Sequence, residues 1–276
     1  MQLSGTFRTM GRMAPTVSVV IPLRRGAEVA PETTARLAAD AAVAEVLPVA
    51  DDGAGPNDAR QRGCEQATGE VVLLLDADVI PGPGLAAGHA AHHAARTGVV
   101  VVGAMPVPAP TEATARLYAD AYGKWLRDVA ADPAVVLRRL WGGNVSLRRE
   151  DALRVGLDEP AMHGRRHEDR ELGLRLAAAG LQGVFDPALA AEHRYHRDLA
   201  SFCADCRAEG AGRMALHRLH PELGPAEVPR GLRAVARPGV AMALIAVVRL
   251  GGPLAAGRAL RRVEIARGMA LEAAGG

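Results

Sequence analysis

Two acidic side chains stand one residue apart directly after a strongly apolar run. Val71–Leu75 contains only valine and leucine, and Asp76 and Asp78 follow it. Ligands of open α/β sheets gather at the carboxyl ends of the strands. Carboxylates on alternate residues at such an edge supply oxygen ligands to a hard divalent cation and leave positions open for diphosphate and water. The alternative is an ordinary solvated turn that starts at Asp78.

A second acidic pair follows another strand-like run. Glu45–Ala50 leads directly into Asp51 and Asp52. Like charges at one sheet edge repel each other unless a cation or a hydrogen-bonding ligand is present. Two acid-terminated strands therefore favour a ligand site over two unrelated turns.

The segments around these acids alternate between strand-like and helix-like runs. Val17–Ile21 is rich in β-branched residues and stops at Pro22, whereas Thr33–Ala44 and Asn57–Ala67 have the length and composition of helices. With the two runs described above they form a strand, helix, strand, helix, strand alternation. This order indicates an α/β sheet of Rossmann type.

The same criteria predict the later elements and three parts of the chain. The expected elements are helices at Leu85–Thr97, Thr111–Ala130, Glu150–Val155 and Asp169–Ala179, and a strand at Val99–Ala104. From Leu199 onward we expect helices, broken at Pro221, Pro225, Pro229, Pro238 and Gly251–Pro253. We therefore expect a flexible arm at residues 1–14, one α/β domain at 15–198 and a C-terminal helical extension at 199–276.

Composition excludes some classes of protein. The net charge of +2 over 276 residues gives no basic face for nucleic acid, so we expect no nucleic-acid partner. Three cysteines are too few for a disulfide-stapled secreted fold, and no signal-peptide pattern opens the chain. The apolar run Val240–Val248 falls short of the roughly 20 residues that a spanning helix needs. A cytoplasmic protein that does not cross the membrane is expected.

Another pair of acids begins a predicted helix. Glu168 and Asp169 precede Leu172, Leu176 and Ala179, which share one helix face. The helix dipole favours acids in a first turn, so capping alone is one interpretation. The other is catalytic, because a carboxylate held ionised at a helix start can take a proton from an acceptor hydroxyl.

The order and spacing of these motifs resemble the inverting glycosyltransferases of family 2. The matching elements are Ile21–Pro22, Asp51–Gly53, Ala59–Gly63, Ala67–Glu70, Asp76–Asp78, Gly142–Arg149 and His167–Asp169 with Leu172, Leu174, Arg175 and Leu176. The resemblance covers about residues 16–197. It implies a GT-A fold, a Rossmann-like nucleotide-diphospho-sugar transferase domain, here followed by the helical extension. Leu23–Gly26 departs from the family's Tyr-Asn turn, so the nucleobase is not predicted.

The resemblance also implies roles for individual residues. The activity would be inverting, metal-dependent transfer of a sugar from a nucleotide diphosphate sugar to an acceptor hydroxyl. The implied donor-binding residues are Pro22, Asp51, Asp52, Arg60, Asp76, Gly143 and Asn144. Asp78, Asp76 and His193 would hold Mg²⁺ or Mn²⁺, and Asp169, with Glu168 beside it, would be the base. Gly142 and Gly143 would let backbone approach the sugar closely, or they form a glycine-rich turn before a strand.

Histidines and cysteines near the end of the catalytic segment allow two interpretations. The family places a metal-completing histidine here, and we favour His193 over His196. These two histidines form an HxxH motif, and Cys203 and Cys206 form a CxxC motif after it. Together the two motifs could bind zinc. Packing of the two cysteines on one helix turn is the alternative, and we expect no stoichiometric zinc.

The C-terminal segment is basic and partly apolar. Its arginines are Arg230, Arg233, Arg237, Arg249, Arg258, Arg261, Arg262 and Arg267. Basic amphipathic helices can lie on an anionic membrane surface, which would suit a lipid-linked acceptor at the inner face of a membrane. The alternative is a helical cap whose arginines face water.

Two alternative functions fit parts of the sequence. A sugar-nucleotide-forming nucleotidyltransferase needs a glycine-rich phosphate loop after the first strand, and Leu23–Gly26 has too little glycine. A catalytically degenerate binding partner of another transferase is the non-enzymatic alternative. The intact Asp76, Asp78 and Asp169 argue against it.

Overall fold

The computed structural model describes residues 14–228, 238–250 and 254–275. The expected N-terminal arm, apart from residue 14, lies outside these residues. So do the expected breaks at Pro229 and at 251–253, and Arg230, Arg233 and Arg237.

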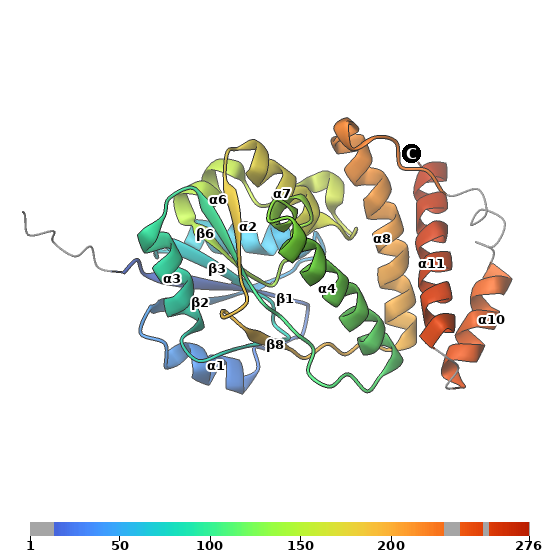
Figure 1. Ribbon diagram of the computed structural model, residues 1–276, viewed down its shortest axis with the longest axis horizontal. Helices are drawn as coiled ribbons and strands as arrows, with labels where there is room; N and C mark the ends of the chain where they lie inside the picture. Colours follow the sequence, from blue (N-terminus) through green and yellow to red (C-terminus); the bar gives the residue numbers. More distant parts are fainter. Residues whose placement is uncertain (1–13, 229–237, 251–253, 276) are drawn as a thin grey trace, which may run out of the picture.

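A six-stranded sheet forms the centre of the protein, in the order β2-β1-β3-β6-β5-β7 (Figure 1). Its strands are β1 (Val17–Leu23), β2 (Val43–Ala50), β3 (Val71–Leu75), β5 (Val99–Gly103), β6 (Asn144–Arg148) and β7 (Gln182–Asp186). The first three strands pair in parallel, as predicted. Strand β6 runs antiparallel to both of its neighbours. It follows Gly142 and Gly143 directly, where a glycine-rich turn before a strand was one of the two interpretations.

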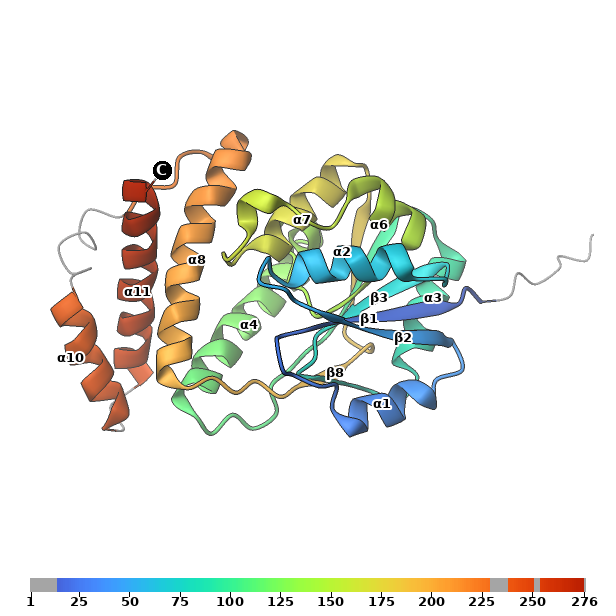
Figure 2. The same cartoon turned by 180° about the vertical axis from the view of Figure 1, so that it is seen from behind.

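Helices cover both faces of this sheet. They are α1 (Pro31–Ala38), α2 (Pro56–Gln66), α3 (Leu85–Ala95), α4 (Ala113–Ala131), α5 (Val135–Arg138), α6 (Arg149–Val155) and α7 (Glu168–Ala178), with one-turn helices η1 (Pro160–Met162) and η2 (Pro221–Leu223). Helices α2 and α6 lie on one face and α3 on the other (Figures 1 and 2).

The helix predicted at Thr33–Ala44 is too long, because α1 ends at Ala38. The Asp40 carboxylate turns away to accept the backbone N–H groups of Ala86 and Ala87 at the start of α3. The Ala42 carbonyl accepts from Val17 N–H, which draws the chain into the sheet. Sheet pairing thus overrides the helix propensity of the alanines.

A small second sheet was not predicted. Strand β4 (Val79–Pro81) pairs antiparallel with β8 (Ala191–His193), and Val79 lies opposite His193. This pairing brings the end of the α/β region back beside the residues that follow β3.

Three C-terminal helices lie beside the sheet region, with α4 next to them (Figure 1). They are α8 (Leu199–Leu219), α10 (Pro238–Arg249) and α11 (Leu254–Gly275), so the helical region begins at the expected residue. A Cβ on Gly210 would lie 2.1 Å from the Ile265 carbonyl oxygen, and one on Gly268 2.0 Å from that of Arg207. Glycine therefore allows α8 and α11 to pack closely.

The apolar residues form two clusters. One surrounds the sheet, and the other joins α8, α10 and α11, with Phe202, Leu260 and Met269 among its buried members. Within the described part of the chain, no helix has both the length and the apolar character needed to span a membrane.

Candidate active site

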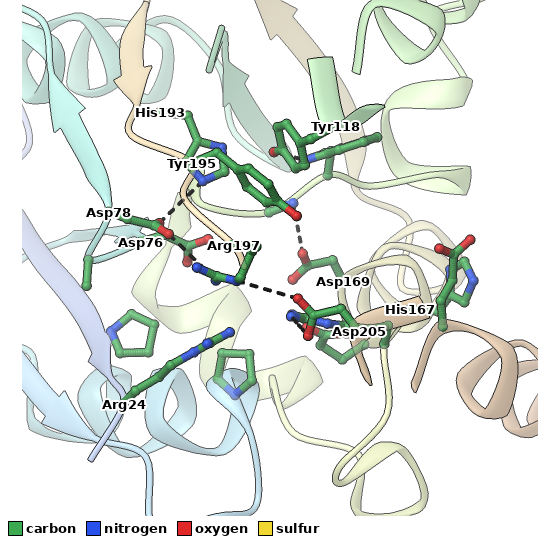
Figure 3. Close-up of a pocket in the computed structure, with 18 of the residues that line it drawn as sticks. Arg24, Asp76, Asp78, Tyr118, His167, Asp169, His193, Tyr195, Arg197 and Asp205 are labelled. Atoms are coloured by element: carbon green, nitrogen blue, oxygen red, sulfur yellow. Dashed lines mark hydrogen bonds and ion pairs between the residues drawn. The ribbon is translucent and has the colours of Figure 1, made fainter. Parts of the chain in front are cut away.

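A cavity of about 660 Å³ opens at the carboxyl edge of the central sheet. One wall comes from the ends of β1, β2 and β3, through Pro22, Asp51, Asp76 and Asp78. The opposite wall, which we call the helical wall, comes from α4, the start of α7, α8 and α11. Figure 3 shows the labelled side chains converging on this space. The α/β edge and the C-terminal helices thus share one site.

Asp76 is placed by the pairing of β3 with β6. Leu75 lies opposite Asn144, and the backbone N–H of Asp76 donates to the Gly143 carbonyl at 3.1 Å. Gly143 has φ +102°, and a Cβ there would lie 2.6 Å from Asp76 Oδ2. The position requires glycine both for its backbone conformation and for the closeness of this carboxylate.

Asp169 lies in the first turn of α7 and contacts Gly142, which precedes Gly143 in the chain. Its Oδ2 accepts the Gly142 N–H at 3.0 Å. A Cβ on Gly142 would lie 2.5 Å from both carboxylate oxygens of Asp169. Gly142 and Gly143 therefore each accommodate one carboxylate of the site, which the interpretation as an ordinary turn does not explain.

Arg60 on α2 bridges these two carboxylates. Its Nη1 donates to Asp169 Oδ1 at 2.7 Å, and its Nη2 donates to Asp76 Oδ1 at 2.6 Å. The residue is only 2% exposed. Burial by itself lowers the pKa of Arg60, but the Asp169 and Asp76 charges outweigh it and the pKa lies above its usual value. A permanently charged guanidinium thus joins the sheet edge to the start of α7.

Glu168 lies beside Asp169 at the same cavity. Burial, followed by the charge of Asp169, raises the pKa of Glu168 to about 7. A cavity carboxyl group with a pKa perturbed by burial and a neighbouring charge is typical of acid–base sites.

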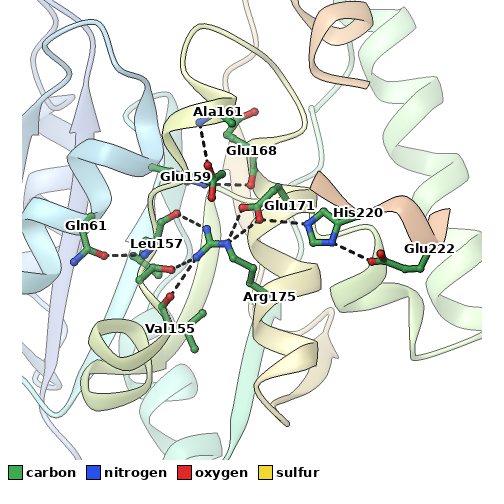
Figure 4. Close-up of polar contacts among 12 residues, drawn as sticks. Gln61, Val155, Leu157, Glu159, Ala161, Glu168, Glu171, Arg175, His220 and Glu222 are labelled. Carbon is green, nitrogen blue, oxygen red and sulfur yellow. Dashed lines mark hydrogen bonds and ion pairs between the residues drawn. The ribbon is translucent and has the colours of Figure 1, made fainter. Parts of the chain in front are cut away.

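Helix α7 is fixed by a polar network away from the cavity (Figure 4). The Arg175 guanidinium donates to Glu171 on its own helix and to the carbonyls of Val155, Gly156 and Leu157. His220, just after α8, lies 3.4 Å from Glu171 through its Nε2. The helix that carries Asp169 is therefore tied to both α6 and α8.

Asp78 and His193 are brought together by the β4–β8 pairing. His193 Nε2 lies 3.4 Å from Asp78 Oδ1, and Arg197 Nη2 lies 3.8 Å from Asp78 Oδ2. Burial raises the pKa of Asp78, but His193 and Arg197 outweigh it, so that the pKa lies below its usual value. An ionised carboxylate and an imidazole nitrogen at this spacing fit a shared Mg²⁺ or Mn²⁺, with Asp76 two residues away.

Other predicted residues lie in different places. Asp51 Oδ1 accepts the N–H groups of Gly53 and Gly55, at the cavity edge. The side chain of Asp52 is 77% exposed, pairs with Arg62 at 3.5 Å and does not line the cavity.

Asn144 is fully buried behind the cavity rather than in it. Its amide donates to the Leu189 carbonyl at 2.9 Å, and its Oδ1 lies 3.0 Å from His89 Nε2. His89 and His93 both contact Ser146 Oγ at 2.8 Å. This geometry does not bring the Asn144 side chain to a donor sugar, so any effect on donor binding would be through its backbone position.

The HxxH and CxxC residues do not come together. His196 is exposed beside Glu112, while Cys203 and Cys206 are buried in the core of the C-terminal helices. Among the described residues, no group of three or more His, Cys, Asp or Glu side chains is placed to hold a metal ion. If Asp78 and His193 are metal ligands, a cation there would also need oxygen ligands from the substrate or water.

Aromatic side chains near the cavity were not predicted. All three tyrosines and both tryptophans of the chain are linked by ring contacts. Tyr118 stacks on Tyr195 with ring centroids 4.3 Å apart and meets His193 edge-on at 4.9 Å. The scarcity of aromatics in the sequence was the available signal, because a composition of 3% makes such a gathering unusual.

The charged residues of the helical wall were also missed. They are Arg166, Arg170, Arg197, Asp205, Glu209 and Arg261. They come from segments that are distant in sequence, and no spacing rule links them.

Comparisons with known proteins give one family match. Residues 46–152 match the family model described as Glycosyl transferase family 2. The matched segment includes Arg60, Asp76, Asp78 and the two glycines. No curated protein matches the chain.

Solved structures share the fold. One is a mannosyltransferase, PcManGT from Pyrobaculum calidifontis, in complex with GDP-Man and Mn²⁺; it has a TM-score of 0.57 and 16% identity, over 94% of this chain and 86% of that one. A weaker likeness, with a TM-score of 0.49 and 17% identity over 78% of each chain, is to mannosyl-3-phosphoglycerate synthase from Rubrobacter xylanophilus. Residues 46–152 are thus similar to the family 2 glycosyltransferases, and the first likeness shows that the chain shares the fold of that mannosyltransferase.

Proposed function

We propose that this glycosyltransferase transfers a sugar from a nucleoside-diphosphate donor to an acceptor hydroxyl, with inversion and with help from a divalent cation. The observation that carries the proposal is the Arg60 bridge, which holds Asp76 and Asp169 in one cavity. One carboxylate belongs to the sheet edge, where a donor would bind, and the other faces the helical wall. Such an arrangement supplies a donor site and a base on either side of one reacting carbon.

The sheet edge would hold the donor. Pro22 and Asp51 line the cavity at the ends of β1 and β2, and Asp76 and Asp78 line it after β3. Asp78 and His193 would hold Mg²⁺ or Mn²⁺, with Asp76 beside them. When bound, the cation neutralises charge that develops on the leaving nucleoside diphosphate. The Pyrobaculum protein was solved with GDP-Man and Mn²⁺, which supports a donor of this class.

Asp169 would be the general base. Its carboxylate accepts from Arg60 and from Gly142 N–H, which fix its position at the cavity. The acceptor oxygen attacks the anomeric carbon as the bond from that carbon to the phosphate oxygen breaks. The acceptor proton passes to Asp169, and the electron pair leaves with the diphosphate. A single displacement of this kind inverts the anomeric configuration.

The test starts from donor binding. We would measure the melting temperature with UDP, GDP and dTDP, each with Mn²⁺ and with EDTA, because a ligand that binds only the folded state raises apparent stability. One diphosphate should raise the melting temperature only when Mn²⁺ is present. Its sugar conjugate should then be consumed, with the product anomer read by NMR. A product that retains configuration would reject the single displacement, and the lack of any diphosphate effect would reject the donor class.

The C-terminal helices would give the enzyme contact with a membrane surface. Met242, Val247 and Leu250 on or next to α10 are 70%, 43% and 87% exposed. The basic side chain of Arg249 is exposed beside them. A Val247→Asp change should weaken sedimentation with anionic vesicles and leave the melting temperature nearly unchanged. Equal sedimentation of the variant would reject this contact.

The division into a GT-A domain at 15–198 and an extension at 199–276 is part of the same proposal. Because α8 and α11 line the cavity, the extension would act in catalysis rather than serve as a separate module. Its helices would complete the acceptor side of the site.

A further inference from the structure

The helical wall has chemistry of its own, distinct from that of the sheet edge. In Figure 3, Asp76 and Asp78 lie to the left of Asp169, His167 lies to its right, and Asp205 lies below it. If Asp169 is the base, as proposed above, the acceptor must lie against the helical wall. The side chains of this wall therefore describe the acceptor.

Apart from the Glu168–Asp169 pair at the start of α7, the helical wall presents four arginines, Arg166, Arg170, Arg197 and Arg261, and two acids, Asp205 and Glu209. Asp205 is shared by Arg166 at 2.7 Å and Arg197 at 3.5 Å. Glu209 is likewise shared by two cations, Arg261 at 2.8 Å and Arg213 at 3.5 Å. Each of these two acids thus forms ion pairs with two arginines.

Arg170 adds a further positive charge without an acidic partner. Its Nε donates to the Arg138 carbonyl, and among the described residues no Asp or Glu forms an ion pair with it. Arg170 lines the cavity one residue after Asp169. A guanidinium left with only a neutral partner is a ready binding group for phosphate or carboxylate.

Neighbouring groups respond to this excess charge. Burial first, and then the charges of Arg213, Arg170 and Arg261, lower the pKa of His167 to about 3. Burial and the charges of Arg139 and Arg213 lower the pKa of Arg170. His167 Nε2 is also buried without a hydrogen-bond partner. The wall is thus electropositive and has an unused polar atom.

Apolar side chains surround these charges. Leu117, Phe202 and Cys206 line the same part of the cavity, and Arg197 lies over the Tyr195 ring at 5.4 Å. Partial exclusion of water strengthens an ion pair between an arginine and an anion.

We propose that the helical wall binds an anionic group of the sugar acceptor, a phosphate or a carboxylate, with Arg170 and Arg261 as its main contacts. The inference rests on the proposed function, which places the acceptor on this side of Asp169. It adds the chemical class of the acceptor. A neutral sugar or alcohol would leave Arg170 with only a neutral partner.

The test uses inorganic phosphate as the probe, in calorimetry with EDTA and no nucleotide. Arg170→Gln and Arg261→Gln should each weaken phosphate binding about tenfold or more, since charge-assisted hydrogen bonds are lost. The matched control is Arg258→Gln, because Arg258 is on the same helix as Arg261, pairs with Asp120 on the surface and does not line the cavity. It should bind phosphate like the wild type.

Melting curves show whether each variant is folded. If one arginine variant does not fold, the other carries the test. Wild-type protein that does not bind phosphate, or two folded variants that bind it as well as the control, would overturn the proposal.

Failure of this inference and failure of the proposed function can be told apart. Asp78→Ala should abolish nucleotide binding with Mn²⁺ if the donor proposal is right, and it should leave phosphate affinity unchanged if the anion lies on the helical wall. Phosphate affinity that falls with Asp78→Ala but not with Arg170→Gln would place the anion at the sheet edge and reject the inference.

The source of the anionic group is read from competition. Glycerol 3-phosphate that displaces phosphate would indicate a water-soluble acceptor. If phosphatidic acid in detergent micelles displaces phosphate more strongly than glycerol 3-phosphate does, the anionic group is a lipid headgroup. Either result supports the subsite, and failure of both to compete would overturn it.

Discussion

The two walls of the cavity have opposite charge and are built in different ways. The sheet edge presents Asp51, Asp76 and Asp78, and one buried arginine from α2 neutralises part of this charge. The helical wall, apart from Glu168 and Asp169 at the start of α7, presents four arginines and two acids. A negative wall suits a cation and its diphosphate, whereas a positive wall suits an anionic acceptor. Under the proposed function, this difference in charge would direct the donor and the acceptor to different walls of the cavity.

The walls also differ in what holds their side chains in place. On the sheet edge, backbone register places Gly143 beside Asp76, and neighbouring atoms are too close for any larger residue. On the helical wall, long arginine side chains reach from separate helices and share acids. Substitutions at the sheet edge should therefore lower the rate of catalysis strongly. Each substitution on the helical wall should lower the affinity for the acceptor by a smaller amount.

The largest effect is expected at the residue between the walls. Asp169→Asn keeps an oxygen that can accept the Gly142 N–H, but the amide cannot take a proton. Turnover should fall by about 10² to 10⁴, while nucleotide affinity and melting temperature nearly hold. Donor consumption under single-turnover conditions measures the loss. Glu168→Gln is the control, and a larger loss there would move the base to Glu168.

Removal of Asp78, the proposed metal ligand at the sheet edge, should be nearly as damaging. Asp78→Ala takes away one of the two groups placed beside each other for a cation. Nucleoside diphosphate affinity measured by calorimetry with Mn²⁺ should drop to the value obtained with EDTA. His196→Ala, at an exposed site on the same segment, should bind normally. Unchanged affinity in Asp78→Ala would end the metal assignment.

An intermediate effect is expected from one added methyl group. Gly142→Ala would place a Cβ 2.5 Å from the Asp169 carboxylate, which forces that carboxylate to move. Overpacking of this kind costs about 1–3 kcal/mol, so the melting temperature and turnover should both fall. Gly123→Ala, inside α4 with its nearest contact at 3.7 Å, should be neutral or slightly stabilising. Normal turnover in Gly142→Ala would show that the carboxylate tolerates displacement.

The smallest effect is expected on the pH dependence of protein stability, through the histidines buried behind the sheet edge. Burial is the main cause that lowers the pKa of His89 to about 3 and of His93 to about 4. The unfolded chain therefore binds more protons than the native state between about pH 4 and 6.5, so stability should fall as pH falls through that window. Glu168 acts in the opposite direction, because its pKa is raised to about 7. It is one group against three, because the pKa of His167 is also lowered, to about 3.

Melting curves from pH 7 to pH 4 test this prediction. His89→Gln should flatten the decline, because glutamine does not take up a proton and can still hydrogen-bond to Ser146 or Asn144. His196→Gln, at an exposed site, should follow the wild type. A wild-type melting temperature that does not fall with acid would contradict the neutral state of the buried histidines.

Local sequence pattern was sufficient to identify the parts of the sheet edge. The apolar run of β3, the acids that follow it and the pair of acids at the start of α7 were all predicted from neighbouring residues. These signals are local because burial and helix capping act on residues close in sequence. Local signals failed at Ala39–Ala44, where pairing with Val17 ends the helix early, and at β6, whose reversed direction depends on its sheet neighbours.

Tertiary structure alone decided which of these parts meet. Asp76 and Asp169 are distant in sequence, and only the packing of α2 between them makes Arg60 their bridge. The choice of His193 rather than His196 depends on the β4–β8 register, and the helical wall depends on α8 and α11 packing beside α4. Composition and spacing set which residues can carry charge. Long-range pairing and glycine-mediated close packing set which charges share a cavity, because no local pattern records a contact between distant segments.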